Sequence, residues 1–312
     1  MPSNENAIRV ENLTKKYGDL VAVNSISFKV RKGEVFAFLG PNGAGKTTTV
    51  EILECIRKPT SGEAYVLGYD IRKNKKEIKR VIGILPQEFE AFDRLTVREN
   101  LEYFAGIYGV EQDVDSLIRI VGLEDKKDTL YKNLSSGLKK RLGVAIALVN
   151  NPEIVFLDEP TSGLDPQARR AVWKVIRDLK RKGKTVFLTT HYMDEAEVLA
   201  DTVTIIHKGE IVAQGTPEEL IEKFGRRSLL IIGKCDERAV EVLKEKGFET
   251  EFNVTNGSLK FPLSSHRSLR EILDTLTRSR IRFGEIHIKS SSLEDVFLNL
   301  IGAKISEEGE LV

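Results

Sequence analysis

The sequence has almost no net charge and very little cysteine. Its 48 lysines and arginines are balanced by 47 aspartates and glutamates, which leaves a formal net charge of +1 over 312 residues. Because no positive excess would attract a phosphate backbone over a long range, we expect no nucleic acid as the main ligand. Cys55 and Cys235 lie far apart with no metal-ligand spacing around them, so we expect two reduced thiols, neither a disulfide framework nor a metal site.

Long apolar segments are also missing. No stretch approaches the roughly 18 to 20 uncharged apolar residues that a membrane-spanning helix needs, and the first residues lack the apolar core of a secretory signal. We therefore expect a cytosolic protein whose membrane role is at most peripheral. What the sequence does contain, 41% hydrophobic and 30% charged residues, is enough for one large or two medium domains with buried cores.

A glycine-rich segment has the form of a phosphate-binding loop. It follows an apolar run at 35–39, which predicts a buried strand, and a helical pattern begins after it at Thr47. The segment matches G-x-x-x-x-G-K-[ST], and its residues are Gly40, Pro41, Asn42, Gly43, Ala44, Gly45, Lys46, Thr47 and Thr48. Glycines let backbone N–H groups converge on phosphates at a helix start. We expect Lys46 to contact the β- and γ-phosphates of ATP and Thr47 to ligate Mg²⁺, with a purely structural turn as the alternative.

A second polar turn also begins a helical pattern, at residues 134–141. Such a helix start is suited to holding phosphate, yet the chain has no second nucleotide pocket to go with it. The simplest interpretation is a dimer in which this turn closes over the ATP that the other copy holds. Alternatively, Ser135 only caps the helix that begins near Leu138, a role that is compatible with phosphate binding.

Two adjacent carboxylates follow another buried strand. An apolar run at 154–157 leads directly into Asp158 and Glu159. The first carboxylate can hold the Mg²⁺ shell, while the second can face the γ-phosphate and polarise a water as general base. The alternative for Glu159 is a solvated carboxylate at the end of a strand.

The order of the apolar segments predicts an α/β fold with a mainly parallel sheet and an N-terminal antiparallel part. Alternating apolar positions over 8–30 indicate the antiparallel strands. Further buried runs and helical patterns occupy residues 154–157, 185–189, 193–200 and 202–206. A capping box at Thr96 starts a helical region that we expect to continue to residue 123, and a buried helix is expected over 138–149.

We expect three parts along the chain: a P-loop NTPase cassette over 1–225, with a helical subdomain at about 88–150, an accessory domain over 226–302 and an acidic tail over 303–312. The accessory domain has the order strand, helix, two strands, helix, strand, which is typical of a small α+β ferredoxin-like domain. Its expected elements cover 229–232, 238–246, two strands around Asn256 and Gly257, 269–278 and 281–288. A last helix is expected at 293–301, and we expect the tail to be disordered from Glu307.

Taken together, residues 7–225 resemble the ATP-binding cassette (ABC) ATPases. The phosphate loop, residues 134–141 in the place of the signature motif, the Asp158–Glu159 pair, the loop at 162–165 and His191 all occur in that family's order. Residues 293–298, Leu-Glu-Asp-Val-Phe-Leu, resemble the ending of a subgroup of drug- or polysaccharide-export ATPases that carry an extra C-terminal domain.

The resemblance implies a role for each matching residue. Tyr17 would stack on adenine, Gln87 would contact Mg²⁺ and the attacking water, and His191 would contact the γ-phosphate. Thr47, Gln87 and Asp158 are then the metal residues, and Glu159, His191, Gln87 and Lys46 the catalytic ones. Ser135 and Gly137 would approach the γ-phosphate held by a partner, as would Asp165 across the dimer, although Asp165 followed by Pro166 also fits a helix cap. For Tyr17 and His191, a purely structural residue is the alternative.

The turn at 134–141 departs from the family's usual Leu-Ser-Gly-Gly-Gln at Ser136 and Leu138, while Ser135 and Gly137 are intact. The chain also lacks the segment that precedes this motif in exporters whose membrane spans are fused to the ATPase. We therefore expect a separate membrane permease, which contacts residues 87–108 through Phe89, Phe92 and Leu95 unless these pack internally.

These observations predict a Mg-dependent ATPase subunit of an ABC transporter. It would form a homodimer on ATP binding, hydrolyse ATP at two composite sites and drive export by the permease from the cytoplasmic face of the membrane. A soluble ABC ATPase that acts on ribosomes or DNA is the alternative. Such proteins usually carry two cassettes or a long coiled coil, and this sequence has neither.

Overall fold

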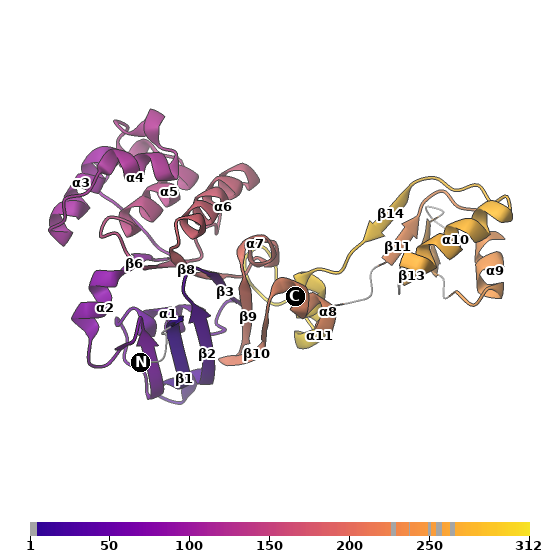
Figure 1. Ribbon diagram of the computed structural model, residues 1–312, viewed down its shortest axis with the longest axis horizontal. Coiled ribbons are helices and arrows are strands. Elements are labelled where there is room, and N and C mark those ends of the chain that lie inside the picture. Colours follow the sequence, from indigo (N-terminus) through magenta and orange to yellow (C-terminus); the bar gives the residue numbers. More distant parts are fainter. Residues whose placement is uncertain (1–4, 226–228, 237, 249–250, 254–257, 263–265) are drawn as a thin grey trace. The chain divides into compact units, whose positions relative to one another are not determined.

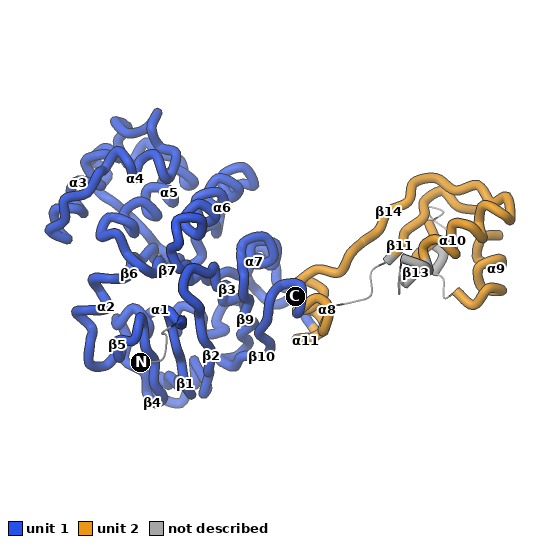
Figure 2. The backbone as a smooth tube through the Cα atoms, viewed as in Figure 1, with its two compact units in different colours: residues 1–219, 303–312 blue, residues 220–302 orange. Residues whose placement is uncertain are grey.

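The computed structural model describes residues 5–225, 229–236, 238–248, 251–253, 258–262 and 266–312. The chain forms two compact units (Figure 2). The first unit comprises Met1–Glu219 together with Ala303–Val312, and the second comprises Leu220–Gly302. In the described part of the chain, no helix is both long and apolar enough to cross a membrane.

The centre of the first unit is a six-stranded sheet (Figure 1). Its order is β10 (Glu210–Gly215), β9 (Thr202–His207), β3 (Val35–Leu39), β8 (Thr185–Thr190), β7 (Ile154–Asp158) and β6 (Ile82–Leu85). Every pair is parallel except β10 with β9. Strands β3, β7 and β8 are buried at every position, as strands covered on both faces are. Their carboxyl ends therefore deliver the phosphate loop, Glu159 and His191 to one edge of the sheet.

A second, antiparallel sheet has the order β2 (Leu20–Arg31), β1 (Asn6–Tyr17), β4 (Ser61–Val66) and β5 (Tyr69–Asp70). It shares a core with the central sheet, where the rings of Phe28, Phe36, Phe38 and Phe187 lie 5.2–6.5 Å apart. Helix α1 (Lys46–Leu53) follows the phosphate loop, and α2 (Lys75–Val81) precedes β6. The sequence prediction of a mainly parallel sheet with an N-terminal antiparallel part is confirmed.

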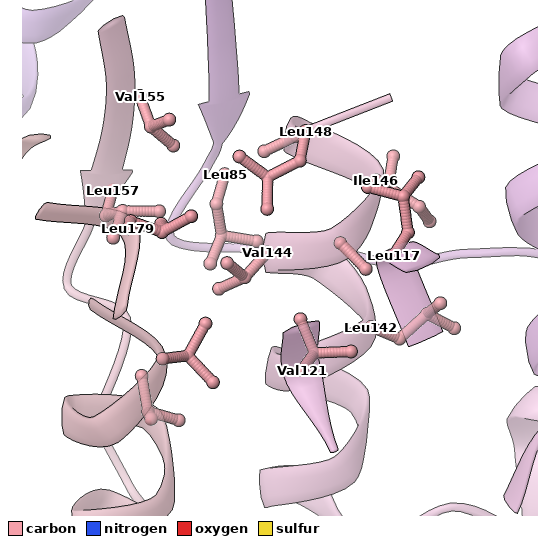
Figure 3. Packing of buried hydrophobic residues seen from close by; sticks show 14 of the residues in the cluster. Leu85, Leu117, Val121, Leu142, Val144, Ile146, Leu148, Val155, Leu157 and Leu179 are labelled. Carbon is pink, nitrogen blue, oxygen red and sulfur yellow. The ribbon is translucent and has the colours of Figure 1, made fainter. Parts of the chain in front are cut away.

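The helical part of this unit contains α3 (Val97–Tyr108), α4 (Val114–Val121) and α5 (Ser136–Ala147), which pack with α6 (Pro166–Arg181). The expected helical region to residue 123 consists of two helices: Gly109 ends α3 with a φ of 64°, and Asp113 caps α4. Figure 3 shows the apolar cluster that holds this part on the sheet, with Val144 of α5 beside Leu85, and with Leu142 on the side of α5 that faces away from the sheet. Residues 193–199 form α7 (Met193–Leu199).

The second unit is ferredoxin-like. Helix α8 (Pro217–Phe224) crosses from the first unit into the second. The elements that follow it are β11 (Leu229–Ile232), α9 (Arg238–Glu245), β12 (Glu251–Asn253), β13 (Ser258–Pro262), α10 (His266–Arg278), β14 (Ile286–Lys289) and α11 (Leu293–Ile301). The sheet order β12-β13-β11-β14, antiparallel throughout, is that of the expected ferredoxin-like fold. The strand expected over 281–288 begins only at Ile286. The predicted turn at Asn256 and Gly257 lies outside the described residues.

The expected disorder from Glu307 is wrong. Residues 304–312 form a hairpin in which the backbones of Lys304 and Val312 exchange hydrogen bonds of 2.8 and 2.9 Å, and Ile305 pairs with Leu311. At its tip, the N–H of Gly309 donates to the carbonyl of Ser306 over 3.0 Å. The acidic composition indicated disorder, but the hairpin is held by backbone hydrogen bonds, which composition does not reveal.

Candidate active site

The phosphate loop can be built only with glycine at two of its positions. Gly45 has a φ of 103°, and a Cβ there would lie 2.4 Å from the carbonyl oxygen of Ala22. At Gly40, a Cβ would lie 2.4 Å from the carbonyl oxygen of Ile206. The loop is thus pressed against β2 and β9 so closely that only hydrogen atoms fit, which brings its backbone amides together at the start of α1.

Lys46 is buried beneath this loop. Its Nζ donates to the carbonyl oxygens of Gly40 at 2.8 Å and Pro41 at 3.1 Å, and it forms an ion pair with Glu159 Oε1 at 3.1 Å. On the other side of the same carboxylate, His191 Nδ1 lies 3.1 Å from Glu159 Oε2. Lys46, Glu159 and His191, from three separate segments, therefore form one buried network centred on a single carboxylate.

The backbone and charge of Glu159 are both unusual. Its φ of 47° is rare for a residue with a side chain and costs conformational energy, a feature that is common at functional sites. Burial would raise the pKa of this carboxyl, but the hydrogen bond to His191 and the charge of Lys46 outweigh burial and lower the pKa to about 2. The carboxylate is consequently ionised at neutral pH.

Asp158 lies beside Glu159 at the end of β7. Burial raises the pKa of Asp158 overall, although hydrogen bonds from the hydroxyls of Thr189 and Thr47 act in the opposite direction. Within the described residues, no three His, Cys, Asp or Glu side chains cluster as a metal cage would require. A hydroxyl next to a carboxylate nevertheless suits Mg²⁺, which takes oxygen ligands and usually shares them with phosphate. The residues present therefore fit a metal that is bound together with a nucleotide.

Gln87 and Tyr17 lie on the surface. The backbone carbonyl of exposed Gln87 accepts a 2.6 Å hydrogen bond from Lys140 Nζ of α5. Tyr17 ends β1 with 37% of its surface exposed, and the Arg57 guanidinium and Lys15 ammonium lie 5.4 and 4.9 Å from its ring centre. The ring of Tyr17 is thus accessible for stacking and has positive charge nearby.

The turn at 134–141 starts α5 as expected. Ser135 Oγ accepts the N–H of Leu138 at 3.4 Å, and a Cβ at Gly137 would lie 2.7 Å from that of Ala168. Asp165 caps α6 by accepting from the N–H groups of Gln167 and Ala168, both at 2.9 Å. Among the described residues, no hydrogen bond or ion pair connects Ser135 or Gly137 with the network around Glu159. The structural roles predicted for Ser135 and Asp165 are confirmed.

Sequence reasoning missed several residues of the site. Lys140 lies close enough to Asp158 and Glu159 for their charges to raise its pKa, although burial lowers it overall. Thr189 Oγ1 donates to Asp158 and accepts the N–H of Glu159 at 3.0 Å. A polar residue inside the apolar run of β8 was the available signal for Thr189. Nothing in the sequence pointed to Glu307, whose carbonyl lies 3.0 Å from His191 Nε2.

The phosphate loop, adjacent carboxylates and histidine at one edge of a parallel sheet define a P-loop nucleotide hydrolase. Comparisons with known proteins narrow this class. A family model described as "ABC transporter" matches residues 23–162, and one described as "ATP-binding protein DrrA1-3-like, C-terminal domain" matches residues 215–301.

Two curated relatives match nearly the whole chain, and a third matches about two thirds of it. The linearmycin resistance ATP-binding protein LnrL of Bacillus subtilis (strain 168) is 33% identical over 310 residues, which cover 96% of this chain and 100% of LnrL. The Nod factor export ATP-binding protein I of Burkholderia lata is 37% identical over 306 residues, 96% of this chain and 98% of that protein. YbhF of Escherichia coli (strain K12), a probable multidrug ABC transporter ATP-binding protein, is 40% identical over 221 residues, 69% of this chain but only 38% of YbhF.

Solved structures share the fold of the first unit. The structure of cbiO1 from Clostridium perfringens, part of the ABC transporter complex cbiONQ, has a TM-score of 0.65 at 30% identity and covers 70% of this chain and 92% of its own. The dimeric post-hydrolysis structure of the cassette MJ0796 bound to ADP and Pi has a TM-score of 0.61 at 27% identity, with 67% and 98% covered. The chain belongs to the ABC transporter family, as one of its ATP-binding proteins. ATP hydrolysis in this family is coupled to transport.

Proposed function

We propose that this chain is the ATPase subunit of an exporter, which acts as a homodimer at the cytoplasmic face of the membrane together with a separate permease. The observation that carries the proposal is the buried network of Lys46, Glu159 and His191 at the carboxyl edge of the sheet. Export is supported by the names of two relatives: LnrL is named for linearmycin resistance, and the Burkholderia protein is named for Nod factor export. No relative reported above is named for ribosomes or DNA.

Each residue of the network has a role in hydrolysis. Lys46 leaves Glu159 for the β- and γ-phosphates, and its departure removes a positive charge that lowers the pKa of Glu159. The carboxylate then becomes a stronger base for the proton of the attacking water. His191 contacts the γ-phosphate while its other nitrogen holds Glu159 in position.

The remaining residues bind and orient the nucleotide. The amides of Gly40–Thr48 surround the phosphates and Tyr17 stacks on adenine. Mg²⁺, held by Thr47, Asp158 and Gln87, would neutralise charge on the phosphates. Ser135, Gly137 and Asp165 face the nucleotide of the partner, because a helix start such as that of α5 is suited to a terminal phosphate.

The permease contacts an exposed aromatic surface on the helical part. Phe92, Tyr103 and Tyr108 are each 45–47% exposed, Ile107 is 62% exposed, and the rings of Phe92 and Tyr103 lie 4.6 Å apart. Phe89 instead packs partly buried against the core, so it contributes less to this surface than expected. Exposed apolar groups that gather in this way are suited to a partner protein.

Replacing the base tests the proposal. We expect Glu159→Gln to retain ATP binding, to lose at least about 100-fold in turnover, as expected for a lost general base, and to form an ATP-stabilised dimer. The matched control is Glu153→Gln, an exposed residue directly before β7. ATP binding is followed with a fluorescent analogue, turnover by phosphate release, and dimerisation by size-exclusion chromatography. Turnover at the wild-type rate in Glu159→Gln would show that Glu159 is not the general base.

A further inference from the structure

The tip of the 304–312 hairpin contacts the phosphate loop and His191. The backbone N–H of Asn42 donates to the carbonyl of Gly309 over 2.7 Å, and its Nδ2 donates to the carbonyl of Glu308 over 2.7 Å. His191 Nε2 lies 3.0 Å from the carbonyl of Glu307, which also accepts from the Tyr192 hydroxyl at 3.2 Å. Three successive carbonyls of the hairpin thus meet donors of the nucleotide site.

The fit at the tip is close. Gly309 is buried and has a φ of 85°, and a Cβ at this position would lie 2.7 Å from Asn42 Oδ1. Any other residue would strain the turn, and its Cβ would force the Asn42 side chain of the phosphate loop to move. The rest of the hairpin offers little apolar anchorage, because Leu311 is 39% and Val312 is 73% exposed. A two-stranded hairpin is only marginally stable alone, so its contacts at the tip are reversible.

The hairpin and a γ-phosphate compete for the same donors. His191 presents one nitrogen to Glu159 and the other to Glu307, so it has no nitrogen left for a phosphate oxygen while the hairpin is bound. The tip is also acidic: Glu310 Oε1 lies 3.3 Å from Asn42 Nδ2, and Glu307 and Glu308 are its neighbours in sequence. Carboxylates at this place repel a terminal phosphate. ADP lacks the γ-phosphate and does not require His191.

We propose that the nucleotide site has a second ligand, the chain's own 304–312 hairpin, which the γ-phosphate of ATP displaces and which ADP leaves in place. The hairpin holds His191 and Asn42 away from substrate, so it restrains ATP binding and hydrolysis in the resting protein. This inference rests on the proposed function, in which His191 contacts the γ-phosphate. It assigns to residues 304–312 a regulatory role that is separate from the catalytic one.

The test compares two nucleotides on three forms of the protein, two of full length and one without the hairpin. Dissociation constants for the non-hydrolysable analogue AMP-PNP and for ADP are measured on wild type, on Gly309→Val and on a chain that ends at Ala303. We expect both altered forms to bind AMP-PNP more tightly by up to about tenfold, since a net hydrogen bond contributes at most about that factor. ADP affinity should stay within about twofold of wild type. The matched control is Glu307→Gln, which keeps the backbone carbonyl and removes one acidic charge, so its AMP-PNP affinity should change clearly less than that of Gly309→Val.

Amide hydrogen exchange supplies a readout that does not depend on a variant. AMP-PNP should increase exchange at the N–H groups of Ser306 and Gly309, which the hairpin protects, and ADP should not. Equal responses to the two nucleotides, or unchanged affinities in both altered forms, would overturn the proposal. An effect of Glu307→Gln as large as that of Gly309→Val would also overturn it, since charge would then replace carbonyl contact as the cause.

The two proposals fail in different ways. If wild type hydrolyses ATP in a Glu159-dependent manner and the hairpin forms are indistinguishable from it, only the hairpin proposal is wrong. If wild type binds no ATP, both proposals are wrong.

Discussion

Lys46 and Glu159 form a buried ion pair, with Nζ 3.1 Å from Oε1. Both side chains are at most 5% exposed, so neither charge has water to replace its partner. Lys46, which we propose contacts phosphate, is therefore paired with Glu159, which we propose activates water. The charge of Lys46 helps to lower the pKa of Glu159 in this buried site. In the proposed mechanism the pair separates before either residue acts on a nucleotide.

Mixing two inactive variants tests the composite site. Ser135→Arg should abolish hydrolysis but retain ATP binding, and Lys46→Ala should lose hydrolysis through its own phosphate loop. In a mixed dimer, one site combines the intact loop of the first variant with the intact turn of the second. Phosphate release should return to about a quarter of the wild-type rate, because half of the dimers carry one working site out of two.

Cross-linking of the mixture shows that mixed dimers form. Their presence without any restored activity would contradict the composite site, and loss of ATP binding in Ser135→Arg would show that the turn is misassigned.

Stability should depend on pH through Glu54. This side chain is 4% exposed, and burial, followed by the nearby charges of Asp158 and Glu51, raises its pKa from 4.5 to about 8. The unfolded chain loses this proton near pH 4.5 while the fold retains it. The stability contribution is therefore complete below about pH 4.5 and is lost as the pH rises through about 8.

Glu54→Gln removes this titration. The free energy of unfolding should then fall less steeply between about pH 5 and about pH 9, by a few kcal/mol in total, because each pKa unit of the shift corresponds to about 1.4 kcal/mol. Urea unfolding of the nucleotide-free protein at each pH measures it. Exposed Glu153→Gln is the control, and an unchanged slope in Glu54→Gln would refute the assignment.

Two glycine-to-alanine changes should have opposite effects on stability. At Gly137 the new Cβ collides with Ala168 on α6, so we expect a loss of about 1–3 kcal/mol in the free energy of unfolding. At Gly106 in α3 no atom lies within 4 Å of an added Cβ, so alanine should stabilise the helix by up to about 1 kcal/mol. Denaturant unfolding of the two variants checks both values. Equal effects would mean that α5 and α6 do not pack as described.

Removing the exposed aromatic surface should weaken binding of the permease and leave ATP hydrolysis unchanged. Phe92→Ser with Tyr103→Ser should leave ATP hydrolysis by the isolated chain within about twofold of wild type, since neither side chain contacts the site. Co-purification of a membrane protein from native membranes should be lost. The control is Leu20→Ser, an apolar side chain that is 66% exposed on β2. Unimpaired co-purification would place the permease contact elsewhere.

The sequence alone was sufficient to predict the cassette. Glycines, a lysine and carboxylates follow the strands because these groups bind phosphate and metal ions. Apolar runs separately predict the buried strands that precede them. These are local constraints, so Gly40–Thr48, Asp158, Glu159 and the caps at Ser135 and Asp165 could be recognised one segment at a time.

Only the tertiary structure decided which partners these groups have. Lys46 contacts Glu159 across 113 positions of sequence, and Glu307 contacts His191 across 116. Such contacts depend on strand order in the sheet and on where the chain returns after residue 302, and neither leaves a periodic pattern in the sequence. The tail was therefore expected to be disordered on composition alone. In the fold, hydrogen bonds to three backbone carbonyls hold the tail on the nucleotide site, and composition does not reveal such bonds.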